Sequence, residues 1–129
     1  MAAVSGAAAA LRAAAREALS AIGGFGLFDA APGQAAFPYV VLECGPETDW
    51  GHKSGAGREL RMAAAVRDRG EAPERLEAIA QACETELCAM SGVVDGWQLV
   101  SLRHLRTRTA RERDGWIAAA EFRARMLKV

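Results

Sequence analysis

The chain has 129 residues, of which 51% are hydrophobic, but alanine alone supplies 29 residues. A chain of this length normally forms one domain, so we expect a single domain over residues 1–129 whose few large apolar side chains pack against alanine. Sixteen basic and sixteen acidic residues cancel, so composition and charge together argue against collagen, extended disorder, a multidomain enzyme and global steering toward nucleic acid or lipid.

The residue types carry two further signals. Fourteen arginines stand against two lysines, and arginine suits bidentate pairing at interfaces, although a skewed genome composition would also raise arginine and alanine together. The three cysteines, Cys44, Cys83 and Cys88, are too few and too irregular for a disulfide framework. They indicate a reduced, intracellular setting.

The N-terminal segment is predicted to be an amphipathic helix with a face of small residues. Ser5 suits its start and Gly23-Gly24 its end. A signal peptide is disfavoured because no basic region precedes it and Arg12 and Arg16 interrupt the apolar run. No run is long enough for a membrane span. Small and apolar residues recur at helical spacing at Val4, Ala8, Leu11, Ala15, Leu19 and Ile22.

A short strand and a long loop are expected next. Pro38 favours extended backbone, and residues 39–42 are apolar on both faces. Residues 45–57 contain four glycines, one proline and no periodicity, so we expect a long mobile loop. Trp50 in this loop either folds back onto the domain or serves as an interface anchor, as exposed tryptophans often do.

The rest of the chain predicts a strand, a helix and a hairpin. Residues 58–69 alternate between apolar and polar side chains, and an apolar stripe follows Pro73 until Gly92. Asp114-Gly115 is the turn signal between arms at residues 97–109 and 116–127. The order α-β-β-α-β-β predicts an α+β fold in which two helices pack on one face of a four-stranded, mostly antiparallel sheet, with the long loop between the first two strands.

The other sheet face would then carry charged side chains. A two-residue turn at Asp114-Gly115 places Arg108 opposite Glu121, which is favourable, and Arg106 opposite Arg123, which is not. Either the register is shifted, by a bulge for example, or a partner subunit neutralises the arginines. The face is a solvated surface, a subunit interface or a nucleic-acid surface, and the lack of stacking aromatics disfavours the last.

No catalytic signature is present. The sequence contains no metalloprotease motif, nucleophile elbow or phosphate-binding glycine loop. Cys83 and Cys88 are spaced for different helix faces, and a metal site that joins Cys44 and His52 to one of them is not favoured. We therefore expect no enzyme, no catalytic residue, no cofactor and no metal.

The chain nevertheless resembles a known family over nearly its whole length. The most characteristic stretches are Phe37-Pro38-Tyr39-Val40-Val41, the helix GEAPERLEAIAQACETEL after Gly70, and the hairpin from Arg113-Asp114-Gly115 to Phe122-Arg123. These resemble the tail terminator (tail-completion) proteins of long-tailed phages, and the alanine- and arginine-rich style is similar to the versions in gene transfer agents. Residues 63–66 depart from the family, in which bulkier side chains are common at this strand.

The resemblance implies a structural role rather than a reaction. Such proteins form a homohexameric ring at the head-proximal end of the tail tube, stop its polymerisation and dock the head-completion (stopper) protein, while DNA passes through the channel. It implies assembly in the host cytoplasm, then residence in the released particle, with no membrane partner. We expect the assembly interface to include Trp50, His52, Lys53, Arg61, Arg106, Arg108, Glu121, Arg123 and Arg125.

Two other functions remain open from the residues alone. A small dimeric α+β ligand-binding protein or enzyme would need polar groups on the helix-facing side of the sheet, where His104 and Arg103 are the candidates. A nucleic-acid-binding module would use residues 103–113 and show steeply salt-dependent affinity.

Overall fold

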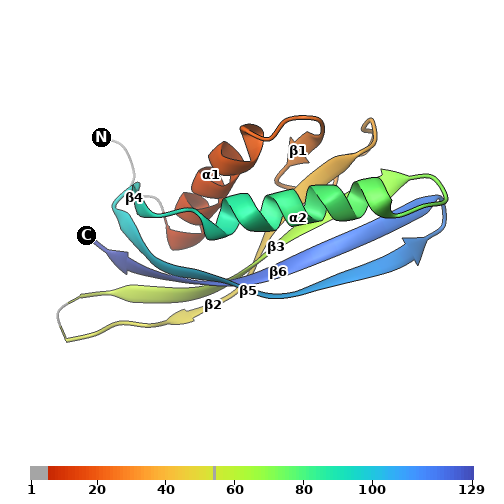
Figure 1. Cartoon of the computed structure of the whole chain (residues 1–129). Coiled ribbons are helices and arrows are strands. Elements are labelled where there is room, and N and C mark those ends of the chain that lie inside the picture. The colour runs from red at the N-terminus through yellow and green to blue at the C-terminus, as the bar shows by residue number, and fades with distance from the viewer. Residues whose placement is uncertain (1–5, 54) are drawn as a thin grey trace.

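The computed structural model describes residues 6–53 and 55–129, in which two helices cover one face of a six-stranded sheet (Figure 1). The α+β class and the placement of both helices on one face are confirmed. No helix of the described residues is long and apolar enough to cross a membrane. The elements in chain order are α1 (Ala7–Ser20), β1 (Gly26–Phe28), β2 (Tyr39–Asp49), β3 (Gly57–Arg69), α2 (Glu74–Cys88), β4 (Gly92–Val94), β5 (Trp97–Glu112) and β6 (Gly115–Lys128).

The first helix has the small-residue face that its periodicity predicts. Ala10, Leu11, Ala15 and Leu19 are fully buried. Gly6 occupies the N-cap position, and the predicted cap Ser5, like Val4, lies outside the described residues. After the helix, Gly23 and Gly24 have φ angles of 75° and 87°, which L side chains rarely adopt, so the chain turns away there.

The sheet has two more strands than the sequence predicts. Its order is β1-β2-β3-β6-β5-β4, with β1 parallel to β2 and every other neighbouring pair antiparallel. The four predicted strands form its interior, so the expected four-stranded sheet is corrected to a mixed six-stranded one. β1 and β4 have three residues each, which is too short for an alternating pattern to be recognised.

The predicted loop at residues 45–57 is partly strand. β2 continues to Asp49 and pairs with β3 from Gly57 onward, with a register shift between Cys44 and Glu47. Gly45 and Pro46 lie in this β-bulge, which removes the alternation that marks a strand. Only residues 50–56 connect the two strands. A Cβ atom at Gly57 would clash with the carbonyl of Trp50, so the glycine permits a close approach of backbones.

The C-terminal hairpin is confirmed, but its turn is displaced. Glu112 pairs with Gly115, so the turn residues are Arg113 and Asp114. Gly115 lies inside β6, where a Cβ atom would clash with the carbonyl of Asp68 on β3. The glycine that resembles a turn signal is therefore a strand residue, needed for the close packing of two backbones.

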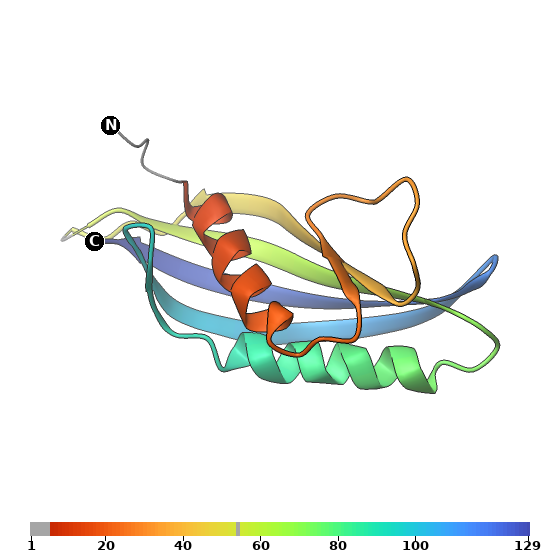
Figure 2. The same cartoon turned by 90° about the horizontal axis from the view of Figure 1, so that it is seen from above.

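The core lies between the helices and the sheet. Phe122 on β6 is the largest fully buried side chain. It is paired with Met62 on β3 and His104 on β5, and the buried Ala120 and Ala124 lie two residues away on either side along β6. Because alanine adds little thickness, both helices approach the sheet closely. Figure 2 shows α2 running alongside β5 while α1 crosses the strands. The predicted apolar stripe of α2 is buried at Leu76, Ala80, Cys83 and Leu87, with Ile79 partly buried.

Candidate functional site

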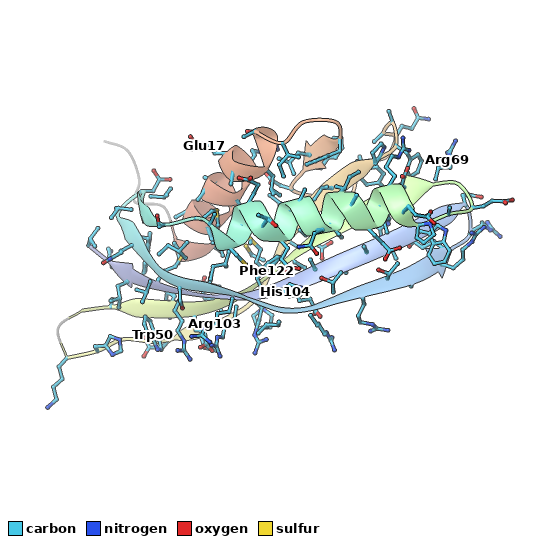
Figure 3. The ribbon with its side chains drawn as sticks, viewed as in Figure 1. Glu17, Trp50, Arg69, Arg103, His104 and Phe122 are labelled. Atoms are coloured by element: carbon cyan, nitrogen blue, oxygen red, sulfur yellow. The ribbon has the colours of Figure 1, made fainter. Side chains whose placement is uncertain are left out.

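The face of the sheet away from the helices, here called the open face, carries a row of three arginines. Arg61 on β3 is paired directly with Arg123 on β6, and Arg123 is paired directly with Arg103 on β5. Adjacent strands are about 4.8 Å apart, so the three cationic side chains rise from neighbouring positions. Figure 3 shows Arg103 and Trp50 on this side of the sheet.

The arginine row (Arg61, Arg123 and Arg103) has no direct ion-pair partner among the described residues. Within the described residues, none of the three forms an ion pair, and the buried Nε of Arg123 has no hydrogen-bond partner. A buried donor without an acceptor is unfavourable, and like charges directly opposite on strands repel. The row therefore has unused capacity for an anionic group.

Two glutamates flank the arginine row and already have partners. Glu59 Oε1 accepts a hydrogen bond from Arg125 Nε at 2.9 Å, and Glu121 accepts one from Arg106. These hydrogen bonds hold the pKa of each carboxyl below its usual value, with the charges of nearby arginines adding to the effect. Both glutamates are therefore ionised. They form their ion pairs with Arg125 and Arg106, so they act on the arginine row only through their nearby charge.

The register explains why the predicted pairing is wrong. Arg106 lies opposite Glu121, and Arg108 lies opposite Ala119, so the expected contacts Arg108–Glu121 and Arg106–Arg123 do not form. The displaced turn moves every pair, and β5 has a further register shift between His104 and Arg106. Two arginines still lie opposite each other on β5 and β6, but the residue opposite Arg123 is Arg103 rather than Arg106.

Trp50 folds back onto the sheet at the base of the β2–β3 connection. Its ring lies 5.3 Å from the Arg125 guanidinium carbon and 4.7 Å from the His52 ring. His52 and Gly55 exchange backbone hydrogen bonds, which tightens the connection. Lys53 is exposed beside them. The first three predicted interface residues are thus gathered at one end of the molecule, and Arg125 joins them to the open face.

The middle of the open face is hollowed where the two bulges lie. The hollow has a volume of about 810 Å³, and its lining includes Glu43, Pro46, Arg61, Leu105 and Glu121. Its charged groups come from four strands and have both signs. It is open at the surface of the sheet, so a partner has access to its charged lining.

A small-ligand site between the helices and the sheet would need several polar side chains that point to one place. The two candidates among the described residues, His104 and Arg103, point to opposite sides of the sheet. His104 does face the helices, where its Nε2 lies 2.7 Å from Thr107 Oγ1 and 3.5 Å from a Glu84 carboxylate oxygen. Arg103, expected beside it, points to the open face instead, because neighbouring strand residues alternate. No group of three metal-binding side chains occurs among the described residues.

The cysteines are free thiols in different environments. Cys44 lies on β2 with its Sγ 3.8 Å from the carbonyl of Ala8, while Cys88 is exposed at the end of α2. Burial raises the pKa of Cys83 to about 11. The buried thiol is therefore protonated and unreactive at neutral pH.

Sequence reasoning missed one structural ion pair. The carboxylate of Asp68, which is 5% exposed, accepts hydrogen bonds from Arg75 Nε at 2.7 Å and Arg75 Nη2 at 2.5 Å, and from the Arg69 backbone N–H at 2.8 Å. The pair ties the end of β3 to the first turn of α2. The signal was available, since Asp68 falls on the apolar side of the alternating strand.

Comparison with known proteins identifies a family and a similar solved structure. The family model for tail completion protein gp17 matches residues 8–127. A chain in the solved structure of the virion of a native gene transfer agent (GTA) particle is 28% identical, with a TM-score of 0.72, and the match covers 93% of this chain and 96% of that one. No curated relative matches the sequence.

Proposed function

Because this chain belongs to the tail completion protein gp17 family, we propose that it is a tail terminator: six copies form a ring that caps the tail tube, stops its polymerisation and joins the tail to the head-completion (stopper) protein. DNA passes through the ring. The observation that carries the proposal is the arginine row on a sheet face that no helix of the described residues covers. Such a row is expected where subunits meet.

The similarity to a virion chain also supports a location for the protein. The GTA virion chain is similar over 93% of this chain, which supports a place within a phage-like particle. We infer that the protein assembles in the host cytoplasm and then remains at the head-proximal end of the tail. Its direct partners are other copies of itself, the tail tube protein and the stopper protein.

The arginine row supports a contact between different surfaces of neighbouring subunits. Cyclic rings of six use heterologous contacts, in which one patch meets a different patch. A row of cations cannot face an identical row, because like charges repel. Carboxylates from a neighbour would neutralise Arg61, Arg103 and Arg123 and give Arg123 Nε the acceptor it lacks within the described residues.

The connection between β2 and β3 offers a second contact surface. Trp50 is held by Arg125 and His52, while Lys53 remains exposed. An anchored tryptophan beside an exposed cation is typical of a protein-binding hot spot. We propose that Trp50, His52 and Lys53 contact the tail tube or the stopper, at one end of the ring.

The mass of the native assembly tests the ring itself. The wild-type protein, alone and mixed with the tail tube protein, is expected to yield a six-copy complex in native mass spectrometry. A dimer under both conditions would contradict the proposal and favour a small dimeric ligand-binding protein or enzyme.

Charge reversal tests the sheet contact. Arg123→Glu places a carboxylate opposite Arg61 and Arg103, so the monomer keeps its fold while the ring is lost. Arg125→Glu is expected to have the same effect on assembly. Arg113→Glu, in the β5–β6 turn, is the matched control and should leave the ring intact. A hexamer that survives the reversals at both 123 and 125 would refute the contact.

Point substitutions test the proposed contact at Trp50, His52 and Lys53. A deletion of residues 45–57 would damage the sheet, because residues 45–49 and 57 belong to strands. Trp50→Ala combined with Lys53→Glu is expected to leave a soluble ring that fails to join tails to heads. Electron microscopy would count joined and free tails. Normal joining by this variant would argue against the assignment.

A further inference from the structure

At each lateral edge of the sheet, the short outer strand leaves part of the next strand without a neighbouring strand. Among the described residues, β4 pairs with β5 only at Trp97–Leu99, so β5 has no outer strand neighbour from Val100 onward. Within the same residues, β1 pairs with β2 only at residues 39–41, so β2 has no outer strand neighbour from Leu42 onward. Uncovered edges expose backbone hydrogen-bonding groups and are natural sites of strand contact.

The uncovered edges lie at the same level along the strands. Pairing across the sheet runs from Glu43 through Ala63 and Glu121 to Arg106. A second row runs from Thr48 through Glu59 and Arg125 to Ser101. Residues 43–48 of β2 and residues 101–106 of β5 are therefore level, on opposite sides of one molecule. A second copy in the same orientation would bring its β2 beside β5 without sliding along the strand direction.

The directions of the strands are also compatible. β2 is antiparallel to β3, β3 to β6, and β6 to β5. Three reversals make β5 antiparallel to β2, so the β2 of a second copy would continue the antiparallel pattern beyond β5.

The charges of the edges are opposite. The uncovered part of β2 carries the exposed acids Glu43, Glu47 and Asp49 and no basic residue. The uncovered part of β5 carries the exposed Arg103, Arg106 and Arg108 and has no acid before Glu112. Val100 and Leu105 on β5 are exposed by 45% and 40%, so this edge also has apolar surface to bury.

We propose that residues 42–49 of β2 in one copy lie against residues 100–108 of β5 in the next. This inference rests on the proposed ring and adds a contact at the strand edges to the one proposed for the open face. Two β5 edges would bring arginines together, and two β2 edges would bring carboxylates together, so repulsion leaves only the β2–β5 arrangement. That arrangement is heterologous, and it closes into a ring when each copy is rotated by the same angle relative to the last.

Pairing of opposite charges stabilises the proposed contact more than backbone hydrogen bonding does. Pro46 has no N–H, and the bulge between Cys44 and Glu47 interrupts any regular ladder. The acidic edge approaches the end of the arginine row at Arg103. Free carboxylates are available there, since neither Glu43 nor Asp49 forms an ion pair within the described part of the chain.

Two reversed variants test the proposal. Variant one carries Arg103→Glu and Arg108→Glu, and variant two carries Glu43→Arg and Asp49→Arg. Each has two edges of like charge and is expected to remain monomeric alone. In an equimolar mixture, the acidic β5 edge of variant one meets the basic β2 edge of variant two, and the unchanged edges also match. The mixture should therefore form rings in which the variants alternate.

Native mass spectrometry identifies the alternating complex by its composition of three copies of each variant. A chain with all four reversals should also assemble by itself, and circular dichroism checks that each variant is folded. Assembly should weaken as salt is raised, because screening reduces attraction between exposed charges.

The outcomes distinguish a failure of the proposed β2–β5 contact from a failure of the proposed ring. Rings formed by either variant alone, or a mixture that stays as separate subunits while the wild type forms hexamers, would overturn the edge contact and leave the ring standing. A wild type that never forms a ring, even with the tail tube protein, would overturn the ring itself.

Discussion

The Asp68→Asn substitution tests how α2 is fixed to the sheet. The carboxylate of Asp68 accepts three hydrogen bonds, two of them from one guanidinium, and the side chain is 5% exposed. Asparagine has the same shape but no charge, and its amide nitrogen would face a donor. The substitution therefore removes the electrostatic part of the attachment while preserving volume.

The expected cost follows from the environment of the carboxylate. A hydrogen bond to a charged group contributes roughly 1.5–3 kcal/mol, and part of the loss is recovered because asparagine keeps one acceptor oxygen. Replacing Asp68 should lower the free energy of unfolding by about 1–2 kcal/mol. For a chain of this size that corresponds to a fall of roughly 3–8 °C in the melting temperature.

The pH dependence supplies the decisive control. The hydrogen bond from Arg75 holds the pKa of Asp68 below its usual value. A carboxyl with a lowered folded-state pKa contributes stability that is complete above its unfolded pKa, about 3.9, and is lost as the pH falls through the folded value. The difference between wild type and Asp68→Asn should therefore be full at neutral pH and shrink in acid.

Urea unfolding at several pH values measures this difference. Glu71→Gln makes the same chemical change at a nearby exposed carboxyl with no ion pair among the described residues, and should leave stability unchanged. If the loss in Asp68→Asn is the same in acid as at neutral pH, then the charge of Asp68 does not hold α2 and the reasoning is wrong.

Three further predictions test the core, the thiols and the open face. Phe122→Ala should lower the free energy of unfolding by about 3–5 kcal/mol in urea, because the change leaves a cavity in a fully buried part of the core; a loss below about 1 kcal/mol would show that the core relaxes. Cys88 should react with iodoacetamide at neutral pH well before Cys83, whose burial raises its pKa to about 11; equal rates would contradict this. Arg103→Glu should raise the melting temperature by placing a carboxylate opposite Arg123, a gain that high salt should remove; an unchanged melting temperature at low salt would mean that the two arginines do not repel.

The fold is predictable where the chain alternates regularly. β3 and β6 bury every second residue over a long stretch, and α2 shows a helical stripe, so these elements are recognised directly. The three-residue strands β1 and β4 have no such pattern, because their formation depends on neighbours that the local sequence does not specify. The extent of β2 is hidden because Gly45 and Pro46 fall within a bulge.

The charged face was predictable, but its pairing was not. The identity of the residues on the open face follows from alternation in β3 and β6. The partner of each residue depends on the turn and on bulges, and Gly115 misleads because it serves the approach to Asp68 rather than the turn. A displacement of the turn by one residue changes the partner of Arg106 from an arginine to Glu121.

The alanines connect the core to the edges of the sheet. Ala64, Ala118, Ala120 and Ala124 are fully buried, so the layer beneath the helices is thin and includes few large side chains. The apolar surface buried within one subunit is correspondingly limited, since burial of larger side chains contributes more stability. Contacts with neighbouring subunits would supply additional burial, and the exposed Val100 and Leu105 lie on the edge where we propose such a contact. Reliance on neighbours would also favour assembled subunits over free ones, because binding stabilises the state that is bound.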